Sequence, residues 1–339
     1  MNLEDGIRAI PKAELHLHIE GTLEPDLMFD LASSNGVELP FPDVEAVRAA
    51  YRFTDLQSFL DIYYRAAAVL QTRDDFARLM AAYLDRAAAA GVVHAEIFFD
   101  PQTHTERGIG FEVFMNGFRD AMADAHRTHG ITSNLILCFL RHLSPEDAVA
   151  TIRAAEDHLE GVVAVGLDSS ESGFPPEPFA EAYEIARSLG LRAVAHAGEE
   201  GPAAYIEGAL DVLGAERIDH GVRCLEDESL VARLRRDRIP LTVCPFSNVA
   251  LRVVDDLAQH PLPEMIDRGL VVTINSDDPA YFGGYIDDNF LGCADVFGWG
   301  MTRVGELAGN SIDASFLDEA TKLKHLAAID EVLTANPDS

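Results

Sequence analysis

The feature that most constrains the fold of this chain is a repeated alternation of short apolar runs with longer, helix-like segments. The apolar runs have the length and residue types of buried strands. There are eight of them, at residues 13–19, 92–99, 131–140, 162–170, 192–199, 217–222, 240–248 and 270–279. Between them lie segments such as "PFAEAYEIARSLG", whose final glycine is typical of a helix C-terminus. This alternation predicts a parallel sheet.

Eight strands are the number that closes a (β/α)8 barrel, so we expect an α/β fold of the TIM-barrel type. The interval from 24 to 91 is too long for one crossover helix and contains helix-like stretches that start at Pro25, Asp55 and Arg73. We therefore expect extra helices after the first strand, and others at the C-terminus, in one domain spanning residues 1–339. An open doubly wound sheet is the alternative, but no G-x-G-x-x-G follows the first strand.

The charge balance limits the kind of partner. The chain has 57 acidic and 26 basic residues, for a net charge of −31. Such a surface repels phosphate backbones and anionic lipid, so we expect neither nucleic acid nor a membrane as a partner. The four cysteines are scattered, which suits a reducing compartment, and we expect a cytoplasmic protein. The sequence does not indicate the oligomeric state.

Polar residues gather where the predicted strands end. In "ELHLHIE", His16 and His18 alternate with apolar residues, so their side chains point to the same side of an extended chain. His196 lies near the end of the fifth run, His220 in the sixth and Asp277 in the eighth. Each has an ordinary structural explanation, such as a turn for "SDDP". Because the C-terminal ends of barrel strands meet at one rim, their convergence instead indicates a metal site.

Imidazole and carboxylate groups together suit Zn²⁺, which can lower the pKa of a bound water toward 7. Glu199, His220 and Asp278 are the nearby groups that could handle protons while water adds to a C=N bond and an amine leaves. Two metals bridged by a modified lysine are excluded, because no lysine lies between Lys12 and Lys322. We therefore expect one metal ion. The P-C-x-x-C element of the zinc deaminases that act on flipped bases is also absent.

With these residues in view, the chain resembles the adenosine/adenine deaminase family of the amidohydrolase superfamily. The resemblance runs through "PKAELHLHIEGTL", "FFDPQTHTERGI", "VGLDSSESGFPP", "HAGEEG", "RIDHGVRCLED", "TVCPFSNVAL" and "SDDPAYFGGY", and covers about residues 10–330. It implies one zinc ion per subunit and a small purine as the substrate. His104, within the second of these segments, has no chemical role in this interpretation, and we expect it to pack or to fix a loop.

The resemblance also implies roles for individual residues. The implied zinc ligands are His16, His18, His196 and Asp277. Glu199 resembles the acid that protonates purine N1, and His220 resembles the group that orients or deprotonates the attacking water. Asp278 resembles the partner of that water and of purine N7. Gly166 resembles the glycine whose backbone N–H faces purine N3.

One position separates the branches of this family. Members that act on adenosine carry an aspartate that meets the ribose, and Glu20 stands there in this chain. We expect its longer side chain to reach into the space of the sugar. The segment "DSSES", with Asp168, Ser169, Ser170 and Glu171 as candidate pocket residues, also resembles the adenine branch.

The resemblance therefore implies a zinc-dependent hydrolase that converts adenine and water to hypoxanthine and ammonia, as in purine salvage. Three alternatives stay open. The first is a deaminase of an N6-substituted or otherwise modified adenine, and the second is a deaminase of adenosine. The third is a catalytically silent barrel that binds a purine or a protein.

Overall fold

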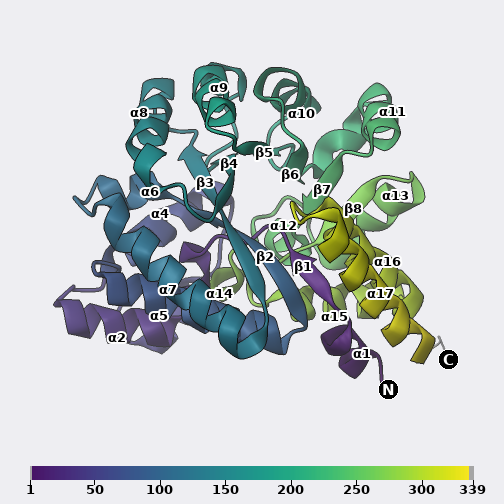
Figure 1. Cartoon of the computed structure of the whole chain (residues 1–339), viewed down its shortest axis with the longest axis horizontal. Helices are drawn as coiled ribbons and strands as arrows, with labels where there is room; N and C mark the ends of the chain where they lie inside the picture. The colour runs from purple at the N-terminus through teal and green to yellow at the C-terminus, as the bar shows by residue number, and fades with distance from the viewer. Residues whose placement is uncertain (1, 336–339) are drawn as a thin grey trace.

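Eight parallel strands form a curved sheet in the computed structural model, which describes residues 2–335 (Figure 1). Their order in the sheet follows the chain from β1 to β8. The strands are β1 (Lys12–Glu14), β2 (Val92–Phe99), β3 (Thr132–Leu140), β4 (Val162–Asp168), β5 (Arg192–Ala197), β6 (Arg217–His220), β7 (Pro240–Val243) and β8 (Val271–Ile274). The predicted α/β barrel is confirmed.

The sheet closes into a barrel through the residues that follow β1. Leu17 forms a parallel bridge to Asp277 beyond β8, and His18 forms one to Phe98 in β2. The predicted strand at 13–19 is therefore wrong in its extent, because the regular strand ends at Glu14. Beyond it the backbone pairs alternately with its two neighbours: the His18 N–H donates to the Asp277 carbonyl and the Ile19 N–H to the Phe98 carbonyl.

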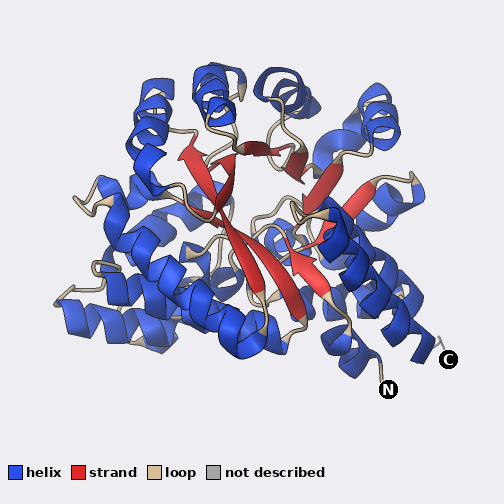
Figure 2. Ribbon diagram, viewed as in Figure 1, coloured by secondary structure: helices blue, strands red, loops and turns tan. Residues whose placement is uncertain are grey.

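Helices cover the outside of the sheet (Figure 2). Those between consecutive strands from β2 to β8 are α6 (Pro101–Thr105), α7 (Phe111–His129), α8 (Pro145–Ala155), α9 (Ala180–Ser188), α10 (Ala203–Gly208), α11 (Glu228–Asp237), α12 (Pro245–Ala250) and α13 (Leu262–Asp267). After β8 come α14 (Pro279–Phe282), α15 (Ile286–Phe297), α16 (Met301–Ala314) and α17 (Glu319–Ala335), and α1 (Leu3–Ala9) precedes β1. Helices α16 and α17 lie beside the barrel near the C-terminus, as predicted.

The long interval after β1 folds into four helices, α2 (Pro25–Asn35), α3 (Val44–Ala50), α4 (Leu56–Ala66) and α5 (Arg73–Ala89). The three predicted helix starts are confirmed to within a residue, since Asp55 is the N-cap of α4. Helix α3 was not predicted, because it is short and has one buried residue, Val47. The extra helices matter for function because α4 covers the C-terminal ends of the strands.

The interior of the barrel is filled by apolar side chains in its middle and lined by polar side chains at the C-terminal ends of the strands. A small apolar cluster fills the middle, formed by Phe98, Ile136, Cys138, Ala164 and Val194. Phe316, from the connection between α16 and α17, packs against this cluster. At the C-terminal ends of the strands, buried polar side chains replace the apolar ones.

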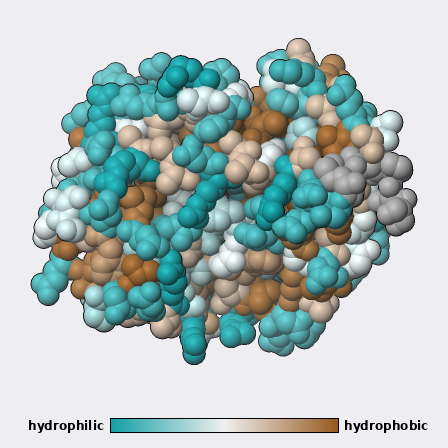
Figure 3. Space-filling view, turned by 90° about the horizontal axis from the view of Figure 1, so that it is seen from below, coloured by the Kyte–Doolittle hydropathy of each residue, from teal (hydrophilic) through white to brown (hydrophobic). Residues whose placement is uncertain are grey.

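The surface carries few large apolar side chains. The face in Figure 3 mixes hydrophilic and hydrophobic residues, with many of the protruding ones hydrophilic. Within residues 2–335, no helix has both the length and the apolar character that crossing a bilayer requires.

Candidate metal centre and substrate cavity

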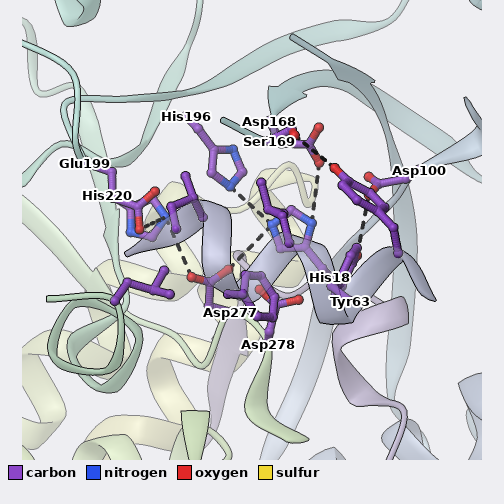
Figure 4. A pocket seen from close by; sticks show the side chains of 15 residues that line it. His18, Tyr63, Asp100, Asp168, Ser169, His196, Glu199, His220, Asp277 and Asp278 are labelled. Atoms are coloured by element: carbon purple, nitrogen blue, oxygen red, sulfur yellow. Dashed lines mark hydrogen bonds and ion pairs between the residues drawn. The ribbon is translucent and has the colours of Figure 1, made fainter. Parts of the chain in front are cut away.

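Four side chains from β5 and from the segments after β1 and β8 converge on one point. The ligand atoms of His16, His18, His196 and Asp277 all lie within 4.8 Å of one another, and all four residues are buried. The Nε2 atoms of His18 and His196 are 3.2 Å apart. Asp277 Oδ1 lies 3.3 Å from His16 Nε2 and 3.5 Å from His18 Nε2. Figure 4 shows His18, His196 and Asp277 pointing toward one another.

This donor set fits a metal ion. Zinc–nitrogen bonds of 2.0–2.1 Å in a tetrahedron place neighbouring donors about 3.3 Å apart, which matches the spacings above. Nδ1 of His16 lies 3.0 Å from Thr242 Oγ1 and 3.1 Å from its carbonyl. Among the described residues, the buried Nε2 of His16 has no hydrogen-bond partner. A bare lone pair aimed at two other imidazoles and a carboxylate is what a cation would satisfy.

Carboxylates behind the cluster face two of its imidazoles. Asp219 Oδ2 lies 3.6 Å from His196 Nδ1, and Asp168 Oδ2 lies 3.5 Å from His18 Nδ1. The hydroxyl of Thr242 donates to Asp219 at 2.8 Å. Outer carboxylates of this kind fix the tautomer and direction of ligating histidines. Asp219 was not predicted, although a buried acid one residue before His220 in an apolar strand is a signal that could have marked it.

Backbone strain gathers at the same rim. Five described residues other than glycine have a positive φ, and three of them line one cavity: Ser169 (φ 73°), His220 (φ 63°) and Asp277 (φ 63°). These residues come at the ends of β4, β6 and β8. Left-handed backbone is unfavourable for residues with a Cβ and persists where the surrounding structure enforces it, often at functional sites.

Glu199, His220 and Asp278 lie next to the cluster, as the sequence predicts. The Nε2 atom of His220 is 3.6 Å from Glu199 Oε1 and 3.7 Å from Asp277 Oδ2. Burial raises the pKa of Glu199 well above its usual range, and the charge of Asp277 adds to this effect. Burial and Asp277 likewise raise the pKa of Asp278. A buried, protonated carboxyl is a group that can donate a proton at neutral pH.

A chain of hydrogen bonds sets the tautomer of His220. The Leu262 N–H donates to His260 Nδ1, so the proton of this neutral imidazole is on Nε2, which donates to Asn248 Oδ1 at 3.1 Å. The amide nitrogen of Asn248 then donates to His220 Nδ1 at 3.2 Å. Since burial lowers the pKa of His220 to about 3, its single proton is on Nε2 and faces the metal cluster.

The cavity beside the cluster has one apolar wall and one polar edge. Helix α4 and the α12 C-terminus supply most of the apolar wall: Leu56, Phe59, Leu60, Tyr63, Tyr64 and Leu251. The polar edge consists of His18, Asp100, Asp168, Ser169, His196, Glu199, His220, Asp277 and Asp278. Within the part of the chain described, Asp100 Oδ1 and both oxygens of Asp168 are buried without a hydrogen-bond partner. This shape suits a flat ring with polar atoms around its edge.

The predicted position of Glu20 needs correction. Glu20 is buried behind the cavity and is not among its lining residues. Its Oε1 lies 2.7 Å from His104 Nε2 and accepts the Asp100 N–H at 3.3 Å. The longer side chain therefore reaches His104 instead of the space expected for a sugar. His104 in turn lies 2.8 Å from Arg107 through Nδ1, so it fixes this loop, as expected.

The other candidate pocket residues divide into two groups. Asp168 and Ser169 line the cavity. Gly166 lies lower in β4, where an added Cβ would be 2.7 Å from Cys138 Sγ, and Ser170 donates to Gln57 at 2.9 Å. Glu171 is buried behind the loop that follows β5.

The cavity contains residues that sequence reasoning did not identify. Asp100 directly follows β2, so the strand-end rule that found His196 could have found it. Nothing in the sequence marks Leu56, Tyr63 or Tyr64 as cavity residues, because an apolar face on a helix usually packs in a core.

Comparisons with known proteins agree with this geometry. The family model described as "Adenosine deaminase" matches residues 11–332. A protein of Cupriavidus taiwanensis named adenine deaminase is 56% identical over 337 residues, which cover 99% of this chain and 96% of that protein. One of Streptomyces coelicolor with the same name is 57% identical over 328 residues, which cover 96% of each chain.

Two solved structures extend the comparison. The adenine deaminase of Arthrobacter aurescens has 53% sequence identity and a TM-score of 0.95, with 96% of this chain and 100% of that chain covered. An amidohydrolase of Burkholderia ambifaria with bound zinc has 29% identity and a TM-score of 0.89, with 98% and 94% covered.

Proposed function

Because this chain belongs to the adenosine deaminase family, we propose that it is an adenine deaminase, which converts adenine and water to hypoxanthine and ammonia. The chain is thus a hydrolase that acts on a C–N bond of a cyclic amidine. The observation that carries the proposal is the convergence of a four-ligand metal cluster and a buried acid, Glu199, in one small cavity. A silent barrel would have no need to keep these groups together.

One Zn²⁺ per subunit would be held by His16, His18, His196 and Asp277. The donor spacing and the bare Nε2 of His16 support this choice, as does the zinc in the Burkholderia amidohydrolase. Bound there, the ion would act as a Lewis acid that makes a water molecule nucleophilic at neutral pH.

Side chains of the protein transfer the protons of the reaction and orient the attacking water. Glu199 gives its proton to purine N1 while water adds to C6, which breaks the C6–N1 π bond. The Nε2–H of His220 and the carboxyl of Asp278 orient the water, and Asp278 also meets N7. Of the two protons of water, one returns to Glu199 and the other goes to the amino group, which leaves C6 as ammonia. A contact between the Gly166 N–H and N3 stays a prediction.

The cavity favours a free base over a nucleoside. A free purine carries an imidazole N–H, which the sugar replaces in a nucleoside. Asp100 Oδ1 and Asp168 Oδ1 are buried without a hydrogen-bond partner among the described residues, and either one can accept such a donor. A ligand without that N–H would leave the acceptor unpaired, which costs about 1–3 kcal/mol. We therefore attribute the preference to these two residues and not to Glu20.

Ammonia release from a purine panel tests the proposal. Adenine, N6-methyladenine and adenosine are compared by kcat/KM, with the metal content measured on the same enzyme sample. We expect adenine to be preferred over adenosine by about 10²-fold or more, because the site would reject a substrate that lacks the N–H. Equal use of adenosine would contradict the preference for a free base, and no ammonia from any purine would contradict the deaminase itself.

A further inference from the structure

A single buried carboxylate holds the loop that carries Glu199. Glu171, in the segment after β4, is 1% exposed. Its two oxygens accept hydrogen bonds from four consecutive backbone N–H groups, those of Gly198 (2.7 Å), Glu199 (3.0 Å), Glu200 (2.8 Å) and Gly201 (2.7 Å). These residues follow directly after β5, which supplies His196.

Successive N–H groups that point to one centre form an anion-binding concavity, or nest. Such concavities usually receive a phosphate or another external anion, whereas here the anion is a side chain of the same protein. One glycine makes room for the carboxylate, and another gives the loop a left-handed backbone. An added Cβ on Gly201 would lie 2.5 Å from Glu171 Oε1, and Gly198 adopts a φ of +71°. The loop is therefore built around the Glu171 carboxylate.

A second charged side chain, that of Arg141, binds the same segment through a backbone carbonyl. Arg141, also 1% exposed, donates through Nη1 to the His196 carbonyl at 2.7 Å. Its Nε donates to the Phe174 carbonyl at 2.8 Å. Since the Phe174 N–H donates to the Glu171 carbonyl, the loops after β4 and β5 are joined into one unit.

The side chain of Glu199 is not fixed by bonds of its own. Its Oε1 is buried without a hydrogen-bond partner among residues 2–335. Its nearest ion-pair partner, His220 Nε2, is 3.6 Å away. The position of this carboxyl therefore depends on the backbone that carries it and on the packing of its side chain, and Glu171 binds that backbone on both sides of Glu199.

We propose that Glu171 is a positioning residue for the deamination: it holds residues 198–201 so that the Glu199 carboxyl faces purine N1. The proposal rests on the proposed function for its kinetic consequences only. Glu171 does not line the cavity and would touch neither the substrate nor the metal. Charge-assisted hydrogen bonds of this kind are stronger than neutral ones, so a carboxylate suits the position better than an amide.

Replacement of the side chain and chemical rescue test this role. Glu171→Ala leaves four N–H groups around a space that a formate ion can enter. We expect kcat for adenine to fall by about 10² or more, since a displacement of about 1 Å costs that much, while KM and the metal content change little. Formate, at about 10–100 mM, should restore part of kcat, because a small carboxylate can fill the nest. The recovered kcat should level off as the formate concentration rises.

Two further variants act as controls. Glu171→Gln keeps the shape but turns an NH₂ group toward backbone donors, so we expect low activity that formate does not improve. Glu216→Ala removes an exposed carboxylate that pairs with Arg192 at the start of β5. This variant should keep normal activity with and without formate. If Glu171→Ala does not fold, Glu171→Asp, which retains the anion but shortens it, takes its place.

Hydrogen exchange gives a measure that does not depend on turnover. The amides of residues 198–201 should exchange slowly in the unmodified protein, faster in Glu171→Ala, and slowly again with formate. Normal kcat in Glu171→Ala, no rescue, or unchanged exchange would each overturn the proposal. Inactivity of the unmodified enzyme toward every purine would instead overturn the proposed function, and the exchange experiment would still test Glu171.

Discussion

Glu199 and Asp277 are two buried carboxyl groups at one site whose surroundings shift their pKa values in opposite directions. Burial acts to raise the pKa of both. At Asp277 the surrounding histidines, with His16 contributing most, together outweigh burial and lower the pKa well below its usual range. At Glu199 the charge of Asp277 adds to burial and raises it. Asp277 is thus held as an anion and Glu199 as a neutral acid, as their proposed roles of metal ligand and proton donor require.

The role of Glu199 predicts the effect of Glu199→Gln. The amide cannot transfer a proton to N1, so we expect kcat for adenine to fall by about 10²–10⁴, the usual contribution of a general acid. The metal content should stay normal because Glu199 is not one of the four ligands. Steady-state kinetics and elemental analysis on one sample measure both. Glu226→Gln, an exposed change on the neighbouring loop, is the control, and normal turnover of Glu199→Gln would contradict the assignment.

Gly21 is required by its contact with Asp278. A Cβ at this position would lie 1.9 Å from Asp278 Oδ1 and 2.7 Å from its Cα. Gly21→Ala should therefore displace the Asp278 carboxyl and reduce kcat/KM by about 10². Gly309→Ala is the matched control, because the nearest atom to its Cβ would be Leu326 Cδ2 at 3.8 Å. Similar kcat/KM values for the two variants would show that Asp278 is not placed by this contact.

Residues at strand ends could be predicted from the sequence, and residues whose side chains depend on distant partners could not. His196 and Asp277 follow apolar runs, so the topology of a barrel brings them to one rim. Glu20 also sits in a motif, but its carboxylate is directed by His104, 84 positions away. The four amides that bind Glu171 are likewise remote in sequence. No local pattern encodes such contacts.

At the scale of elements, the positions of strands could be predicted better than their ends. The run 240–248 contains the short strand Pro240–Val243 and most of the helix Pro245–Ala250. Both parts are buried, so hydrophobicity alone does not separate them. Pro245 is the sequence signal for the boundary, because proline is favoured in the first turn of a helix.

Helix α4 forms the cover of the cavity, and its N-terminal cap predicts how to loosen it. The Asp55 side chain accepts the Ser58 N–H at 2.8 Å, and Ser58 Oγ accepts the Asp55 N–H at 3.3 Å. Asp55→Ala should destabilise α4 by about 1 kcal/mol. We expect faster hydrogen exchange in α4 and a higher KM for adenine, because Leu56 and its neighbours line the cavity. The metal content should not change.

Asp43→Ala provides the matched control for this helix. Asp43 caps α3 in the same way, through the Ala46 N–H at 2.8 Å, but α3 contributes no residue to the cavity lining. The loss of stability should be similar and confined to α3, with KM unchanged. If the two variants raised KM equally, the cover would not be the reason for the effect.

At the scale of the whole molecule, the acidic surface agrees with the proposed substrate. A net charge of −31 repels anions that approach from solution. Adenine is uncharged at neutral pH and would not be repelled, whereas a phosphorylated purine would be. This charge therefore disfavours nucleotides relative to a free base.

The end of the barrel opposite the cavity is closed by a buried ion pair. Arg217 in β6 donates to Glu96 in β2 at 2.6 Å, and both side chains are fully buried. Arg217 also donates to the carbonyls of Leu15 and Ala314, and Glu96 accepts the N–H of Phe316. This network ties two strands, the segment after β1 and the connection from α16 to α17 into one closed end.

This network predicts how stability depends on acid. Burial alone would raise the pKa of Glu96, but Arg217, His94 and the Phe316 N–H together outweigh it and lower the pKa to about 2 from the ordinary value of 4.5. A carboxyl with a lowered pKa in the folded state stabilises the protein above pH 4.5. That contribution, on the order of 3 kcal/mol, is lost as the pH falls from 4.5 toward 2.

Glu96→Gln isolates this contribution. At pH 7 the variant should be less stable by about 3–5 kcal/mol, because Arg217 is left buried without its anion. Urea unfolding of both proteins at several pH values between 7 and 3 measures the difference. Acid also protonates the histidines of the metal site, but this happens in both proteins and cancels in the comparison. The difference should therefore shrink below pH 4.5, and a constant difference would show that Glu96 is not ionised in the folded protein.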